Sequence, residues 1–177
     1  MPAMRRAIAS TLLLFASTAL ADGAAGLTWT PPKAWITDQQ RPMRAATYHI
    51  SPAKGDGEGA ECAVFYFGQG QGGTVDANVT RWVGQFEQPD GKASSSVAKT
   101  TQEKAKDLAV TRVEVAGTYT GAGGPMAQVP VKKPGFKLLG AIVEGPQGPV
   151  FFKLTGLVKT VDGARADFDK MIKSIAH

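Results

Sequence analysis

Two alternating segments joined by a short turn constrain the fold of this chain more than any other feature. The segments are Phe136–Glu144 and Val150–Leu157, and the turn between them is Gly145-Pro146-Gln147-Gly148. Apolar residues at every second position, bounded by glycine and proline, indicate a β-hairpin. In the second segment the alternation places Val150, Phe152 and Leu154 inward, with Lys153 and Thr155 outward. The chain is therefore expected to contain antiparallel pairing.

The rest of the strand pattern also favours antiparallel pairing. A second hairpin is predicted from Val97–Glu103 and Leu108–Thr120. Three further strands are predicted at Leu27–Thr30, Met43–Ile50 and Cys62–Phe67. The last of these is apolar on both faces, as expected for a central strand that is covered on each side. Gly121–Gly135 contains many glycines and prolines, which leave little room for regular pairing, and is predicted to be a loop.

Two segments change to the periodicity of a helix. Between Thr74 and Phe86 the apolar residues fall on one stripe, which consists of Val75, Val79, Trp82, Val83 and Phe86. Thr74 or Asp76 can cap the start of this helix. A closing helix is predicted from about Gly163 to Ile175, with acids early and lysines late, as the helix dipole favours. Two helices among hairpin-connected strands predict an α+β fold, an antiparallel sheet flanked by helices.

The first 21 residues have the features of a cleaved export signal. Arg5-Arg6 forms a positive start, Ala7–Ala19 is an apolar stretch without charge, and Ala19-Leu20-Ala21 is a small-x-small cleavage site. We therefore expect cleavage after Ala21, a single globular domain over residues 22–177, and a periplasmic or secreted location. No segment reaches the roughly 18 uninterrupted apolar residues that a membrane span needs, so no transmembrane segment is predicted.

Charge and cysteine content exclude several classes of protein. The formal charge of +5 falls to +3 once Arg5-Arg6 is removed, and the remaining basic residues are scattered among acids. No nucleic-acid surface is therefore predicted. Cys62 is the single cysteine, so an intramolecular disulfide cannot form. Its place in a β-prone run predicts a buried, unreactive thiol.

Residues suited to catalysis or metal binding are sparse. The histidines are His49 and His177, and His49 has no recognisable Ser or Cys partner in a nucleophile motif. No histidines or cysteines have the spacing of a zinc site, and Asp56-Gly57-Glu58 is too sparse for a calcium loop. We therefore predict no catalytic residue, no metal and no cofactor, while an enzyme that uses carboxylates alone stays an open alternative.

Gly68–Gly73 matches the pattern G-x-G-x-x-G of dinucleotide-binding turns. It follows an apolar strand and precedes a helix, where glycines would let the backbone approach a phosphate. The helix is followed by a Pro-Asp-Gly turn and a polar loop, whereas a nucleotide-binding unit continues with a parallel strand that ends in an acid. The context therefore argues against a nucleotide. Binding of phosphate or another anion stays open, and a strand-to-helix connector is the simplest interpretation.

Aromatic residues gather in the first half of the chain, at Trp29, Trp35, Tyr66, Phe67 and Trp82. Core packing is their simplest role, and they could converge at one side of the sheet. A partly exposed tryptophan beside the glycine-rich turn would instead anchor a partner or a ligand. The candidate binding residues are therefore Gly68, Gln69, Gly70, Gln71, Gly72, Gly73 and Trp82.

Several short motifs follow one another in a familiar order. They are Pro32-Lys33-Ala34-Trp35 after the first strand, Lys-Leu-x-Gly at Lys137–Gly140, Phe-Phe-Lys-Leu-Thr-Gly at Phe151–Gly156, and a closing helix with Phe168 and Ser174-Ile175. This order resembles the PsbP family, extrinsic subunits of photosystem II and their bacterial relatives, whose fold a Ran-binding nuclear import factor shares. The resemblance implies an antiparallel sheet between helical layers and a non-catalytic binding role. It carries no binding residue over to this chain.

The sequence therefore predicts an exported, non-enzymatic domain that binds a protein or a cell-envelope component. The expected contact surface is the Gly68–Gly73 turn with the helix start after it, together with the Gly121–Gly135 loop. The alternative is a periplasmic protein that binds a small ligand or an anion with the same turn. Neither interpretation involves a nucleic acid.

Overall fold

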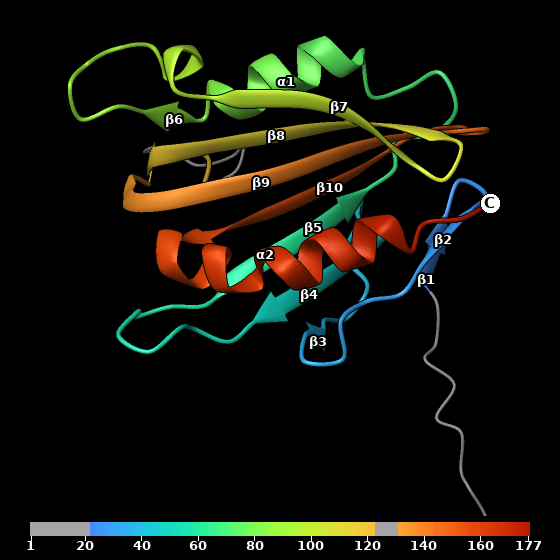
Figure 1. Cartoon of the computed structure of the whole chain (residues 1–177), viewed down its shortest axis with the longest axis horizontal. Coiled ribbons are helices and arrows are strands. Elements are labelled where there is room, and N and C mark those ends of the chain that lie inside the picture. The colour runs from blue at the N-terminus through green and yellow to red at the C-terminus, as the bar shows by residue number, and fades with distance from the viewer. Residues whose placement is uncertain (1–21, 123–130) are drawn as a thin grey trace, which may run out of the picture.

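The computed structural model describes residues 22–122 and 131–177. Within this part of the chain, eight strands form one antiparallel sheet in the order β3-β4-β5-β10-β9-β8-β6, with β7 also paired to β8, while β1 and β2 form a separate pair (Figure 1). The predicted export signal and the middle of the predicted Gly121–Gly135 loop lie outside the described residues.

The elements follow one another in a simple order. The first five strands are β1 (Asp22–Ala24), β2 (Leu27–Trp29), β3 (Ile36–Thr37), β4 (Ala46–Ile50) and β5 (Ala60–Phe65). Helix α1 (Val75–Val83), β6 (Phe86–Glu87) and a short 3-10 helix, η1 (Ser94–Ser96), come next. The chain then forms β7 (Lys99–Ala105), β8 (Leu108–Tyr119), β9 (Lys133–Gly145), β10 (Gly148–Leu157) and α2 (Val158–Lys173).

Both predicted hairpins are confirmed. β9 pairs with β10 across the turn at Pro146-Gln147, and β7 pairs with β8 across Lys106-Asp107. β5 pairs with β10 on one side and with β4 on the other, which makes it the covered central strand that its apolar sequence predicts. The side chain of Cys62 in this strand is fully buried, and burial raises the pKa of its thiol, as expected for an unreactive cysteine.

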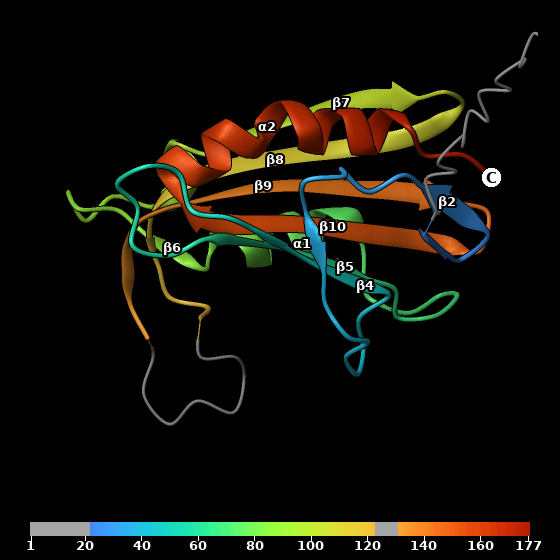
Figure 2. The ribbon, with the colours of Figure 1, turned by 90° about the horizontal axis from the view of Figure 1, so that it is seen from below.

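A helix lies on each face of the sheet, α2 above and α1 below in Figure 2. This is the predicted α+β arrangement. One core, on the α2 face, contains Val150, Phe152 and Leu154, as the alternation of β10 predicts. The opposite face of β10 is not open to solvent, because Phe151 packs in a second core beside α1 and Lys153 is partly buried. The prediction that Lys153 points outward is therefore wrong.

The helix boundaries differ from the predicted ones. Thr74 caps α1 as expected, since its hydroxyl accepts a hydrogen bond from the backbone N–H of Ala77, but the helix ends at Val83 and Phe86 lies in β6. The closing helix begins at Val158, five residues before the predicted start. Gly163 was expected to mark that start, yet it occupies an exposed position inside α2. Periodicity identifies both helices but does not locate their ends.

The aromatic residues do not converge on one side of the sheet. Trp29 and Trp35 belong to the core beside α2, whereas Trp82 and Phe67 belong to the core beside α1. Trp29 donates a hydrogen bond from Nε1 to the hydroxyl of buried Tyr48 at 2.7 Å. That hydroxyl donates in turn to the carboxylate of Asp22. The first described residue of the chain is thereby tied to the centre of the fold.

Replacing Gly140 in β9 with alanine is expected to lower the free energy of unfolding by about 1–3 kcal/mol. The added Cβ would lie 2.4 Å from Cζ3 of Trp82, whose ring is buried and has to shift. Gly163→Ala is the matched control, since no atom lies within 4 Å of its Cβ position and it should gain about 0.5–1 kcal/mol from helix propensity. Urea denaturation measures both, and equal stability of Gly140→Ala and the parent protein contradicts the packing described.

Candidate functional site

The Gly68–Gly73 turn is fixed from within the fold. It leads from β5 into α1, and four of its glycines, Gly68, Gly70, Gly72 and Gly73, have positive φ angles that favour glycine. The amide of Asn78, which is fully buried, donates to the backbone oxygens of Gly72 and Thr74, each at 2.8 Å. The glycines therefore allow the backbone conformation of this turn. The first turn of α1 is already capped by Thr74.

Trp82 does not extend this turn as an exposed anchor. Only 4% of its surface is exposed, and its ring covers Gly140 of β9 and packs edge-on against Phe151. Trp82 belongs to the apolar stripe of α1, and this stripe faces the sheet. The side chain of Trp82 is therefore buried. A role for Trp82 in direct partner contact is therefore corrected to a role in the core.

The glycine-rich turn meets other loops around Tyr66. The hydroxyl of Tyr66 donates to the backbone oxygen of Gln147, in the β9–β10 turn, at 2.8 Å. A Cβ at Gly148 would lie 3.7 Å from the backbone oxygen of Gly68, which shows how closely the two turns pack. We call the surface formed by Tyr66, the Gly68–Gly73 turn, Gln147 and residues 40–45 the Tyr66 end.

An open hollow of about 560 Å³ lies at the Tyr66 end, between β1 and residues 40–45. Tyr66 and Met43 line it, and Met43 is 74% exposed. Met43 also has a positive φ of 64°, a conformation that costs a residue other than glycine about 1 kcal/mol or more. The apolar side chain of Met43 is therefore exposed to solvent beside the hollow. The surrounding structure has to stabilise its unfavourable backbone conformation.

Ion pairs hold residues 38–44 in place beside β4 and β5. Arg44 lies 2.9 Å from the carboxylate of Glu61, and Arg41 pairs with Asp38. Hydrogen bonding to His49 at 3.1 Å, to the backbone of Gln39 and to Arg41 lowers the pKa of Asp38 to about 2. His49 therefore has a carboxylate partner in the fold. Each charged residue of this segment has a partner of opposite charge, either within the segment or on β5. Met43 is its exposed apolar residue.

The two glycine-rich loops of the predicted contact surface lie at opposite ends of the sheet. Gly68 is near the Gly145 end of β9, while Gly121 and Ala122 follow the end of β8 that pairs with Lys133. β9 is 13 residues long, which corresponds to about 40 Å of extended chain. A contact surface that joins the two loops would therefore have to run the length of the sheet.

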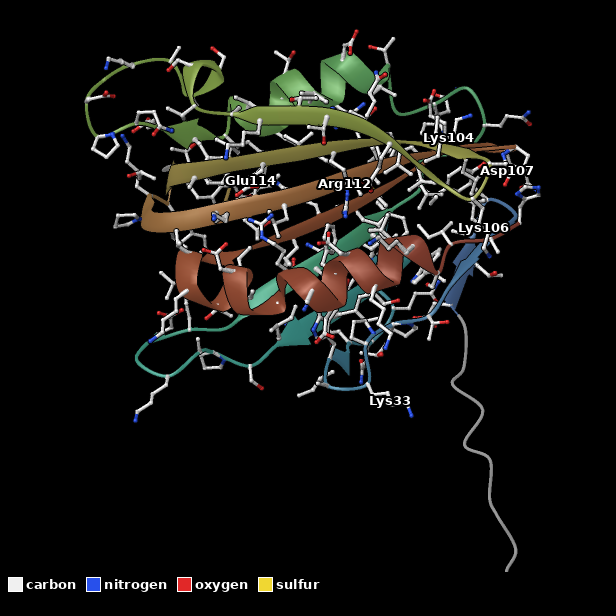
Figure 3. All side chains as sticks on the ribbon, viewed as in Figure 1. Lys33, Lys104, Lys106, Asp107, Arg112 and Glu114 are labelled. Carbon is white, nitrogen blue, oxygen red and sulfur yellow. The ribbon has the colours of Figure 1, made fainter. Side chains whose placement is uncertain are left out.

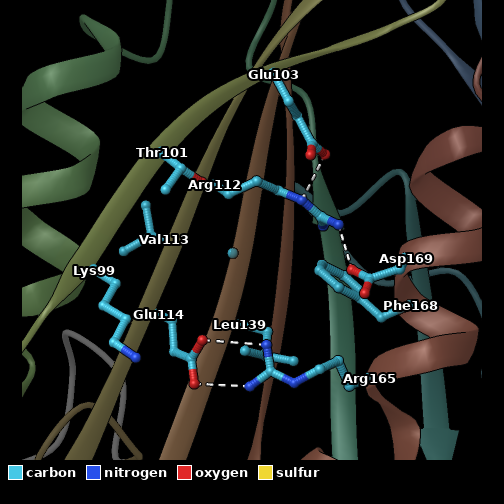
Figure 4. Close-up of a pocket in the computed structure, with 11 residues that line it drawn as sticks. Lys99, Thr101, Glu103, Arg112, Val113, Glu114, Leu139, Arg165, Phe168 and Asp169 are labelled. Atoms are coloured by element: carbon cyan, nitrogen blue, oxygen red, sulfur yellow. Dashed lines mark hydrogen bonds and ion pairs between the residues drawn. The ribbon is translucent and has the colours of Figure 1, made fainter.

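A second depression, of about 210 Å³, is lined by charged residues of β7, β8 and α2. Arg112 and Glu114 enter it from β8, while Lys104, Lys106 and Asp107 lie at the β7–β8 turn (Figure 3). Arg165 of α2 donates two hydrogen bonds to the carboxylate of Glu114, at 2.7 and 3.1 Å (Figure 4). Arg112 pairs with Asp169 of α2 and, at 2.9 Å, with Glu103 of β7. These paired charges bind α2 to the sheet.

Comparison with solved structures gives a match that covers nearly the whole chain. No protein-family model and no curated protein matches the chain. The solution structure of cyanobacterial PsbP (CyanoP) from Synechocystis sp. PCC 6803 matches with a TM-score of 0.52 and 12% identity, over 94% of this chain and 97% of that one. This chain has a PsbP-like fold. The PsbP-like arrangement of sheet and helices agrees with the resemblance found in the sequence, and at this identity the match concerns the fold alone.

The described residues contain neither a membrane-spanning helix nor a cluster of metal-binding side chains. None of the helices in residues 22–122 and 131–177 is both long and apolar enough to cross a membrane. In the same residues, no three His, Cys, Asp or Glu side chains come together in a way that could hold a metal ion. The candidate sites in the described part of the chain are the Tyr66 end and the depression beside α2.

Substituting Glu114→Gln should weaken the attachment of α2 in a pH-dependent way. Hydrogen bonding to Arg165 lowers the pKa of Glu114, so its stabilising effect is present above the usual carboxyl range and is lost as pH falls through the lowered pKa. We expect a loss of about 1 kcal/mol at pH 7. The difference from the parent should vanish in strong acid.

Urea denaturation at a series of pH values measures this difference. Asp107→Asn, at a carboxylate that is 70% exposed, is the control and should have little effect. A Glu114→Gln protein as stable as the parent at neutral pH contradicts a stabilising role for the pairs.

Proposed function

We propose that this protein is an exported, non-enzymatic domain that binds a protein or cell-envelope partner through the Tyr66 end. Residues 1–21 act as its export signal, and the mature chain begins at Asp22 in the periplasm or outside the cell. The observation that carries the proposal is Met43, which is 74% exposed beside an open hollow. The export signal and the PsbP-like fold support the proposal.

The chemistry of the Tyr66 end fits a protein partner. Methionine is enriched at protein interfaces, because its unbranched side chain adapts to different apolar surfaces. The hollow beside Met43 can receive an apolar side chain, and Tyr66 offers a rigid aromatic wall. Arg41 and Arg44 already have acidic partners within the chain, so an acidic partner is not required. We infer that the partner presents an apolar anchor with a polar surround.

The alternative proposal is that a small ligand or an anion binds at the Gly68–Gly73 turn. It has less support at this position. An anion at a helix start needs backbone N–H groups that point outward. Thr74 accepts the hydrogen bond of one such group, from Ala77, and Asn78 fixes the carbonyl groups before it. A thermal-shift panel on the mature chain tests this alternative, which requires a stabilising compound at millimolar concentration or below.

The partner-binding proposal predicts that Met43→Asn weakens capture of a partner without changing the fold. Asparagine tolerates the positive φ at this position but removes the apolar contact. Mature chain from Asp22 is used as bait in native envelope extract, and bound proteins are quantified by mass spectrometry. We expect about a five- to thirtyfold loss for the main partner, as when a small interface anchor of about 1–2 kcal/mol is removed.

Val97→Asn is the matched control, because Val97 is also apolar and about half exposed but lies next to η1. It should capture the partner as well as the parent chain does. Gly70→Asn tests the turn itself, since no atom lies within 4 Å of its Cβ position. Undiminished capture by both Met43→Asn and Gly70→Asn, with the proteins folded, would place the partner elsewhere.

A further inference from the structure

Lys153 lies in the middle of the sheet between two small residues. On β10 it pairs with Ala63 of β5 on one side and with Gly140 of β9 on the other. The ring of Trp82 fills the space above Gly140. The space above Ala63 is not filled, and a cavity of about 360 Å³ opens there. This cavity shares no described lining residue with the depression beside α2, and it shares Arg44 with the hollow at the Tyr66 end.

The walls of this cavity combine aromatic rings and charged side chains. Phe65, Phe136 and Tyr119 supply the rings, and Arg44 and Lys133 lie on the rim. Each rim cation has an acidic partner, at 2.9 Å for Arg44 with Glu61 and 2.5 Å for Lys133 with Glu58. The positive charge of Lys153 lies deeper, on the floor.

The ammonium group of Lys153 has no acidic partner. Its Nζ donates to Oε1 of Gln85 at 2.6 Å and to the hydroxyl of Tyr119 at 3.0 Å, both neutral groups. No described carboxylate lies within 4.0 Å of it, and residues 1–21 and 123–130 contain no Asp or Glu. An ammonium has three N–H donors, so a third is available for a ligand.

The surroundings of Lys153 confirm that its charge is poorly compensated. Burial lowers the pKa of Lys153 most, to about 8, and the positive charge of Arg81 on α1 adds to this; Glu61 on β5 opposes the shift, and Arg44 before β4 has the smallest lowering effect. Arg81 has a neutral partner as well, since it donates to the amide oxygen of Asn78. Burial raises the pKa of Tyr119, which keeps the phenol neutral. A partly buried cation without a carboxylate in direct contact favours an anion from outside.

We propose that the cavity above Ala63 binds a small organic anion, whose carboxylate accepts a hydrogen bond from Lys153 and whose apolar body lies against Phe65 and Phe136. The volume of about 360 Å³ is at the lower end of the range for small-molecule sites, which fits a compact ligand. The aromatic walls favour a planar body over a bare inorganic ion. This site goes beyond the proposed partner binding at the Tyr66 end.

Benzoate is the probe, and benzamide is its neutral counterpart of the same shape. Both are titrated into the mature chain and followed by calorimetry and by amide chemical shifts of residues around Ala63. We expect benzoate to bind in the millimolar range or tighter and at least about tenfold more tightly than benzamide. Lys153→Met should remove this preference, and Lys92→Met, at an exposed lysine paired with Asp90, should leave it unchanged.

The pH dependence tests the charge without a substitution. The anion binds the ammonium form, so benzoate affinity should be constant well below the pKa of about 8 and fall roughly tenfold for each pH unit above it. Arginine keeps its charge throughout this pH range, so the benzoate affinity of Lys153→Arg should not fall above about pH 8. Should Lys153→Met fail to fold, this profile decides the matter in the parent protein.

Four outcomes overturn the proposal. Equal affinities for benzoate and benzamide would show that charge is not recognised. Unchanged benzoate binding in a folded Lys153→Met protein would place the anion elsewhere, as would chemical-shift changes confined to the Gly68–Gly73 turn. No binding by the folded parent at about 10 mM benzoate would show that the cavity does not serve as a site for this class of ligand. None of these outcomes bears on capture of a partner through Met43.

Discussion

The structure depends on covering both faces of a long sheet with short helices. α1 has nine residues and α2 sixteen, whereas β8, β9 and β10 span ten to thirteen residues of extended chain each. The N-terminal segment with Trp29 and Trp35 completes the cover on the α2 face. Cover remains incomplete on the α2 face beside β7 and β8, and on the α1 face above β5 and β10. Both candidate depressions in the sheet follow from this mismatch in size.

The two depressions differ in the partners of their positively charged side chains. Beside α2 each arginine has a carboxylate partner from a neighbouring element, so these ion pairs join the secondary structures around the depression. Above Ala63, the lysine on the floor has neutral partners, and its lowered pKa records the free energy that its charge costs in the free protein. Local costs that the fold does not relieve tend to mark functional sites.

The sequence was sufficient to predict the hairpins, both helices and the α+β class, because alternation and helical periodicity report which residues share a face. It does not report whether the other face is covered, and for this reason Lys153 was expected in solvent. Trp82 was expected at a binding surface although its own stripe pointed it inward. Met43 was expected in a strand, but β4 begins at Ala46. In Arg41-Pro42-Met43-Arg44, a methionine beside proline and between two arginines was the available sign of an exposed turn.

Arg44 connects the two proposed sites. Arg44 lines both the hollow beside Met43 and the cavity above Ala63, and its guanidinium pairs at 2.9 Å with Glu61, which also lines the cavity. An anion bound near Lys153 adds a negative charge that competes with Glu61 for this guanidinium. A partner seated against Met43 would lie beside the same residue, because Arg44 also lines that hollow. Because linkage is reciprocal, any effect of the anion on partner affinity must be matched by an equal effect of the partner on anion affinity.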